Sequence, residues 1–143
     1  MVIHFWPESV SGRQELTVGA FKALEAKKYE LAVSKAEEVI GEFAGIASDR
    51  QKKLENEKAQ EPPIGKLTDE QKAALFQEGL LNDVAACYFI KGRALEHLRR
   101  NTEARTNYEA AAKLTYARTY SPDEDIFWSP ADGAKGRLNT LPK

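Results

Sequence analysis

Apolar residues recur at three- and four-residue steps through most of this chain, and this spacing limits the fold more than any other feature of the sequence. Between Gln14 and Leu114 the residues that favour helices predominate, namely alanine, leucine, glutamate, lysine, arginine and glutamine. Apolar and polar residues nowhere alternate in this region over the length of a strand. The sequence therefore predicts an all-α fold in which amphipathic helices each bury one face.

Length, charge and composition exclude several classes of protein. A chain of 143 residues is expected to form one domain, here a single helical domain over residues 1–143. Its 21 Lys and Arg residues are balanced by 22 Asp and Glu residues, so it lacks the basic excess of a dedicated nucleic-acid-binding protein. One cysteine and two histidines cannot build a disulfide framework or a Cys/His zinc site, and we expect neither a metal site nor a cofactor. No segment has the apolar length of a membrane span and no secretory signal is evident, so we expect a cytoplasmic protein without membrane contact.

Capping and breaking residues divide the first half of the chain into segments. A first helix is predicted over residues 13–26, where Ser11 and Gln14 form an S-x-x-Q capping box. A second helix begins near Tyr29 and keeps its apolar residues in helical spacing. Residues 61–67 form a loop, because two consecutive prolines and a glycine cannot continue a helix.

The second half of the chain contains two further helical patterns. Thr68 and Gln71 form the capping box of the first, which meets no strong breaker before Arg100 and is predicted to be one helix of about 30 residues. Asn101 is the predicted N-cap of the last pattern, which ends near Arg118.

Residues 119–143 are expected to form a C-terminal cap and tail. Ser121 and Ser129 each open a capping box and each precede a proline, so two short helical turns are predicted. Phe127 and Trp128 lie between them and would expose a large apolar patch if left in water. We therefore expect both to dock onto the last long helix or onto the same face of a second subunit. The alternative is that Trp128 is a free anchor for a partner.

Residues 88–95 read Tyr-Phe-Ile-Lys-Gly-Arg-Ala-Leu, and Ala104 and Tyr108 follow at fixed distances. This pattern resembles the tetratricopeptide repeat, a helix-turn-helix unit of about 34 residues. Residues 13–43 resemble a looser copy of the same unit. Lys91 and Ala36 depart from the repeat pattern, and neither unit ends with its proline.

The same positions have a role in packing. Small residues let helix backbones approach closely, and tyrosines fill the gaps that small residues leave. Together with the resemblance, this predicts stacked antiparallel helical hairpins over residues 13–43 and 85–118. The small residues are Ala20, Ala32, Gly92, Ala104 and Ala111, and the tyrosines are Tyr29, Tyr88 and Tyr108.

Residues 44–84 separate the two repeat-like hairpins and are expected to form a helical arm. Residues 44–60 and 68–84 flank the loop at 61–67 and match in length, each about 25 Å as a helix. Two elongated antiparallel central helices are therefore predicted. Because glycines in both halves could end shorter helices, the alternative is a third, degenerate repeat over residues 46–82.

The resemblance also implies a binding site. Tetratricopeptide repeats bind extended peptides or partner helices in a concave groove lined by the first helix of each hairpin. The implied positions are Gln14, Thr17, Phe21 and Leu24 in the first unit and Phe89, Arg93, Glu96 and His97 in the second. The lysines and asparagines with which some members grip a C-terminal carboxylate are missing here, so that activity is not expected. The alternative for Phe21 and Phe89 is that both are core residues.

A local basic patch is predicted inside the otherwise neutral chain. Its members are Arg93, Arg99, Arg100 and Arg105, which cluster around one helical turn and the loop after it. Such a patch could meet a phosphate backbone or an acidic peptide. Because no aromatic residues are interleaved for base stacking, nucleic acid is not favoured as the partner.

No pattern in the chain indicates catalysis. Cys87 lies on an apolar helical face, where a free cysteine is a small core residue far more often than a nucleophile. His97 has no second metal ligand at helical spacing, and glycine-rich phosphate-binding loops and nucleophile elbows are absent from the sequence.

The leading functional hypothesis is thus a non-enzymatic interaction module or scaffold of the tetratricopeptide type, whose partner is an unidentified protein or peptide. A second hypothesis is a self-assembling structural homodimer, because such stacks normally need three or more repeats. A third is a regulatory subunit that binds an anionic ligand through the basic patch.

Overall fold

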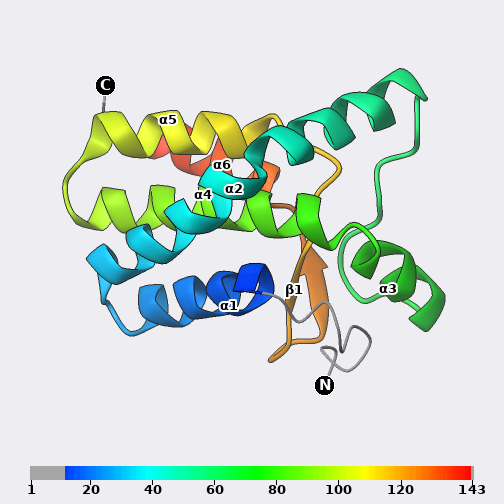
Figure 1. Ribbon diagram of the computed structural model, residues 1–143, viewed down its shortest axis with the longest axis horizontal. Coiled ribbons are helices and arrows are strands. Elements are labelled where there is room, and N and C mark those ends of the chain that lie inside the picture. Colours follow the sequence, from blue (N-terminus) through cyan, green and yellow to red (C-terminus); the bar gives the residue numbers. More distant parts are fainter. Residues whose placement is uncertain (1–11, 143) are drawn as a thin grey trace.

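The computed structural model describes residues 12–142, which form helices and one small β-hairpin (Figure 1). The helices are α1 (Gly12–Glu25), α2 (Tyr29–Asn56), α3 (Asp69–Phe76), α4 (Gly79–His97), α5 (Asn101–Ala112) and α6 (Pro130–Thr140). The strands are β1 (Thr119–Ser121) and β2 (Ile126–Trp128), which pair antiparallel. The fold is all-α, as predicted. None of the described helices combines the length and the apolar character that crossing a membrane requires.

Helix α4 lies at the centre of the fold and contacts α1, α2, α5 and α6. Because neighbours surround it, most of its faces are apolar, and its buried residues include Leu81, Val84, Cys87 and Leu95. Burial raises the pKa of the Cys87 thiol to about 12. This cysteine therefore packs as a small apolar side chain, as predicted.

Two helical hairpins, α1 with α2 and α4 with α5, lie against each other through α2 and α4 (Figure 1). Some of their ends differ from the prediction. The capping box of Thr68 and Gln71 forms at the start of α3, whereas Ser11 lies outside the described residues. Asn101 is the first residue of α5 and not its cap, and α5 ends at Ala112, earlier than predicted.

Small residues stand where the helices meet. Ala20, Ala32 and Ala104 have no exposed surface. A Cβ atom on Gly92 would lie 2.6 Å from a ring carbon of Tyr108, so this glycine leaves the space that the tyrosine ring fills. The predicted packing of small residues and tyrosines is confirmed at this contact between α4 and α5.

Leucine at position 104 is expected to overpack this interface. Ala104→Leu should lower the free energy of unfolding by about 1 to 3 kcal/mol, because α5 cannot retreat from its neighbours without losing other contacts. The exposed Glu109 on the same helix provides the control, since Glu109→Leu should change stability by no more than about 0.5 kcal/mol. Urea unfolding measures both, and equal effects of the two substitutions would contradict close packing at Ala104.

Residues 44–84 do not form the predicted arm. Helix α2 continues past both of its glycines, but its second half is packed against the rest of the chain. Ala47 has no exposed surface. The buried side chain of Gln51 accepts a hydrogen bond from the backbone N–H of Tyr116 (3.1 Å) and donates one to Oγ1 of Thr115 (2.9 Å). These contacts hold the end of α2 against the segment that follows α5.

The other half of the predicted arm is split, because α3 ends at Phe76 and α4 begins at Gly79. Buried Asn82 explains the break. Its Nδ2 donates to the carbonyl of Leu75 (2.8 Å), which satisfies the end of α3, and its Oδ1 accepts from the backbone N–H of Arg118 (2.9 Å). The single helix of about 30 residues is therefore wrong, and α3 lies well apart from the end of α2 (Figure 1).

The C-terminal region forms a β-hairpin and a helix. Ser121 does not begin a helical turn, since it ends β1, which pairs residue by residue with β2. Ser129 does cap a helix, as predicted. Its Oγ accepts a hydrogen bond from the N–H of Asp132 (3.1 Å), and Pro130 follows as the first residue of α6. Helix α6 packs along α5 and covers it.

Candidate binding groove and basic pocket

A groove of about 600 Å³ is bounded by α1, α4, the β-hairpin and the end of α3. Apolar side chains from all of these elements line it. They include Val18, Phe21, Phe76, Leu80, Phe89, Ile90, Phe127 and Trp128. Concave sites with a mostly apolar lining are typical of ligand binding.

One face of α1 forms a side of the groove. Gln14, Val18, Phe21 and Glu25 recur at three- and four-residue steps, which places them on this face. Val18 is 45% exposed and Phe21 is 42% exposed. Together these large apolar side chains form an exposed apolar surface. The alternative prediction, that Phe21 is a core residue, is therefore wrong.

Aromatic residues form the opposite wall. The Trp128 ring meets the Phe89 ring edge to face, with centroids 5.2 Å apart. Phe127 is 2% exposed and lies between Phe76 and Tyr120, with centroid distances of 5.6 and 4.9 Å. The expected docking of both residues onto the last long helix is therefore wrong, because these rings contact α3, α4 and β1 instead. Trp128 is half-buried, with its ring packed on Phe89.

Polar contacts join α1 to α4 along the groove. Nε of Arg13 donates to Oδ2 of Asp83 at 2.8 Å, and the Arg13 guanidinium lies over the ring of Phe43. Burial raises the pKa of Asp83 to about 6, against the opposing attraction of Arg13. Oγ1 of Thr17 donates to the carbonyl of Arg13 (2.9 Å) and lies 3.6 Å from Sγ of Cys87, so Thr17 belongs to the contact between the helices.

The raised pKa predicts a pH-dependent stability. Asp83 has a pKa of about 6 in the folded chain, against the ordinary value of 3.8. Between these two pH values the carboxyl of the folded chain keeps a proton that the unfolded chain has released. The stability that this carboxyl contributes is greatest below about pH 4 and is lost as the pH rises through about 6. We expect the melting temperature of wild type to rise relative to that of Asp83→Asn as the pH falls across this range. A difference that does not vary with pH would contradict the raised pKa.

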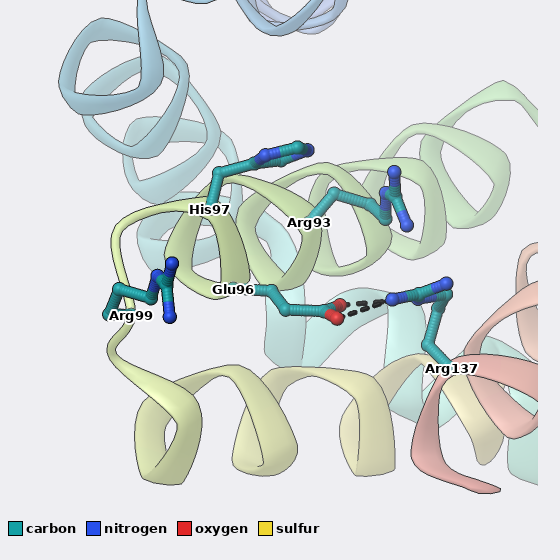
Figure 2. A pocket seen from close by; sticks show the side chains of 5 residues that line it. All are labelled: Arg93, Glu96, His97, Arg99 and Arg137. Carbon is teal, nitrogen blue, oxygen red and sulfur yellow. Dashed lines mark hydrogen bonds and ion pairs between the residues drawn. The ribbon is translucent and has the colours of Figure 1, made fainter. Parts of the chain in front are cut away.

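A second cavity, of about 260 Å³, opens where the end of α4 faces α6 and is called the basic pocket here. Figure 2 shows Arg93, Glu96 and His97 on the last turns of α4, Arg99 in the turn that follows, and Arg137 on α6. Three guanidinium groups and an imidazole thus share the pocket with a single carboxylate.

Neighbouring side chains hold two residues of the basic pocket in place. Glu96 accepts hydrogen bonds from Nε of Arg137 (3.2 Å), from Nη2 of Arg137 and from the Tyr108 hydroxyl (2.7 Å). Burial acts to raise the pKa of Glu96, but the hydrogen bonds from Arg137 and Tyr108 outweigh it and lower that pKa. The His97 ring stacks on Tyr29 with centroids 4.5 Å apart. Glu96 is therefore an ionised carboxylate whose charge Arg137 balances.

The positions implied by the resemblance divide between the two cavities. Gln14, Thr17, Phe21 and Phe89 line the groove, and Arg93, Glu96 and His97 line the basic pocket. Leu24 lines neither of them and packs partly against the core. Phe89 and Arg93 are one helical turn apart on α4, so the groove and the basic pocket follow each other along the same helix.

The four arginines of the predicted basic patch have different surroundings. Arg93 and Arg99 line the basic pocket. Arg100 instead pairs with Glu103 on the first turn of α5 at 2.8 Å. Arg105 donates a hydrogen bond to the carbonyl of Pro142 at 2.9 Å.

Sequence reasoning missed Arg137, and it named Phe127 and Trp128 without predicting the β-hairpin that carries them. Arg137 lies 41 residues from Glu96 along the chain, and no local pattern indicates that they meet. For the wall there was a signal, since residues 126–128 are large and favour strands.

Within residues 12–142 no three side chains of His, Cys, Asp or Glu are grouped so that they could hold a metal ion. Comparisons of the chain with protein-family models, with curated proteins and with solved structures found no match.

Proposed function

We propose that this chain is a cytoplasmic, non-enzymatic interaction module of the tetratricopeptide type, and that its groove binds a segment of a partner protein through apolar side chains. One observation carries the proposal: exposed Val18 and Phe21 on α1 face an aromatic wall across a concave site of about 600 Å³. Removing this apolar surface from water would drive association.

The form of the groove supports a partner segment with bulky apolar side chains. Phe21, Phe89 and Trp128 offer ring surfaces, and such residues are enriched where proteins bind one another. Gln14 and Gln77 at the same groove offer amide groups that can hydrogen-bond the backbone of an extended segment. The resemblance supports the same site, because four of its implied positions line this one groove.

Selection from a random-peptide library displayed on phage, with the full chain as bait, tests the proposal. Peptides rich in apolar residues are expected, and anisotropy of a labelled selected peptide should show binding. Phe21→Asp should weaken that binding by about tenfold or more, since it places a charge where an apolar side chain would be buried. The matched control is Leu31→Asp on α2, because Leu31 is 44% exposed, much like Phe21, but lies outside the groove.

Two outcomes would contradict the proposal. In the first, the selection enriches no peptide; in the second, the enriched peptides bind wild type and Phe21→Asp equally well. Light scattering over a dilution series examines the homodimer alternative. A dimer that dissociates in Phe21→Asp and persists in Leu31→Asp would show that the groove receives a second copy of this chain instead.

A further inference from the structure

The basic pocket holds more positive charge than its own carboxylate balances. Glu96 is the one carboxylate in its lining, and Arg137 already neutralises it. Arg93 and Arg99 form no ion pair with any residue in the described part of the chain. The lining of the basic pocket therefore includes two guanidinium groups that have no ion-pair partner.

The two arginines share a concave site, although Arg99 is exposed to solvent in the turn after α4. Arg93 is half-buried, and both arginines line a concave site of about 260 Å³ whose other walls are the α6 helix and the stacked ring of His97. Concave sites lined by one sign of charge concentrate the field and attract ligands of the opposite sign. Figure 2 shows the arginines coming from three different segments, which the fold brings to one cavity.

We propose that the basic pocket binds a phosphate group, either inorganic phosphate or the phosphate of a small ester, through Arg93 and Arg99. A phosphate dianion matches the two uncompensated charges. The planar guanidinium group also presents paired N–H donors whose spacing fits two phosphate oxygens. This site is separate from the groove and does not rest on the function proposed for it.

Glu96 is expected to weaken phosphate binding at this site. Its charge repels an anion in the pocket, and its hydrogen bonds occupy Arg137, which is thereby withheld from the ligand. Glu96→Gln removes the repulsion, loosens Arg137 and still provides an acceptor for the Tyr108 hydroxyl. Loss of this acidic residue should therefore strengthen phosphate binding by about threefold.

Titration of the isotope-labelled full chain with sodium phosphate, followed by amide NMR, tests the proposal. Sodium chloride at matched ionic strength provides the blank. We expect the amide signals of Arg93, His97 and Arg99 to shift and to saturate, and the Arg137 signal to shift with them. Succinate is titrated in parallel, because a dicarboxylate of similar charge distinguishes a phosphate site from a carboxylate site.

Two double variants with the same loss of charge give a matched comparison. Arg93→Gln with Arg99→Gln should weaken phosphate binding by about tenfold or more, since two charged hydrogen-bond donors are lost. Arg100→Gln with Arg105→Gln should leave it unchanged, because these arginines contact Glu103 and a backbone carbonyl outside the pocket. Dispersion of the remaining amide signals shows that each variant is folded.

Shifts that grow without saturation in phosphate would overturn the proposal, as would equal weakening in the two double variants. Saturation by succinate alone would show that the site selects carboxylates, and the assignment to phosphate would then be wrong. The groove variant Phe21→Asp should bind phosphate as wild type does. Failure of the peptide experiment and failure of this titration are thus independent results.

Discussion

Replacement of Arg118 by methionine is expected to lower the free energy of unfolding by about 3 kcal/mol. Arg118 is 5% exposed, and its guanidinium donates to the carbonyls of Pro62 (2.8 and 3.1 Å), Thr115 (2.9 Å) and Ala117 (2.7 Å). Methionine has a similar length but donates no hydrogen bond, so these oxygens lose their donor. Glu61 approaches only to 3.9 Å, so the carbonyl groups, more than an ion pair, hold this side chain. Urea unfolding measures the loss.

The same substitution should loosen the connection between α2 and α3. Arg118 ties this connection, residues 57–68, to the segment after α5. Trypsin should therefore cut faster after Lys58 or Lys66 in Arg118→Met than in wild type. Arg100→Met is the control, because Arg100 is exposed and its loss should cost no more than about 0.5 kcal/mol. Wild-type stability together with wild-type cleavage would contradict the role given to Arg118.

Gly92→Ala is expected to destabilise the chain by about 2 kcal/mol, although alanine normally favours a helix over glycine by about 1 kcal/mol. The added Cβ would lie 2.6 and 2.7 Å from two ring carbons of Tyr108. That ring has no exposed surface, and its hydroxyl is bonded to Glu96 at 2.7 Å, so it cannot move aside freely. The steric cost should therefore exceed the gain in helix propensity.

A second glycine in a helix gives the opposite expectation. Nothing lies within 4 Å of a Cβ built on Gly41 in α2, so Gly41→Ala should stabilise the chain by about 1 kcal/mol. Chemical unfolding of both variants measures the two signs side by side. If Gly92→Ala also stabilises the chain, the close contact between Gly92 of α4 and the Tyr108 ring of α5 is contradicted.

Part of the candidate site could be predicted from the sequence. The resemblance to the tetratricopeptide repeat implied Gln14 and Phe21 in the first hairpin and Phe89 in the second as lining positions. The groove between these faces also needs Trp128, and the basic pocket needs Arg137. Both come from the C-terminal region, and only the folded chain brings them to α4.

By itself the sequence determined the all-α class, the start of α2, the capping box at Thr68, the N-cap at Ser129, and the close contact at Gly92. Each depends on residues a few positions apart, or on side-chain size along one helix face, and such signals act locally. Tertiary structure alone decided the break after α3, the anchoring of the end of α2 and the β-hairpin. The long-range hydrogen bonds of Asn82 and Gln51 join residues that lie 36 to 65 positions apart in the sequence. A buried polar group must find a partner wherever the fold supplies one, and that demand outweighs local helix propensity.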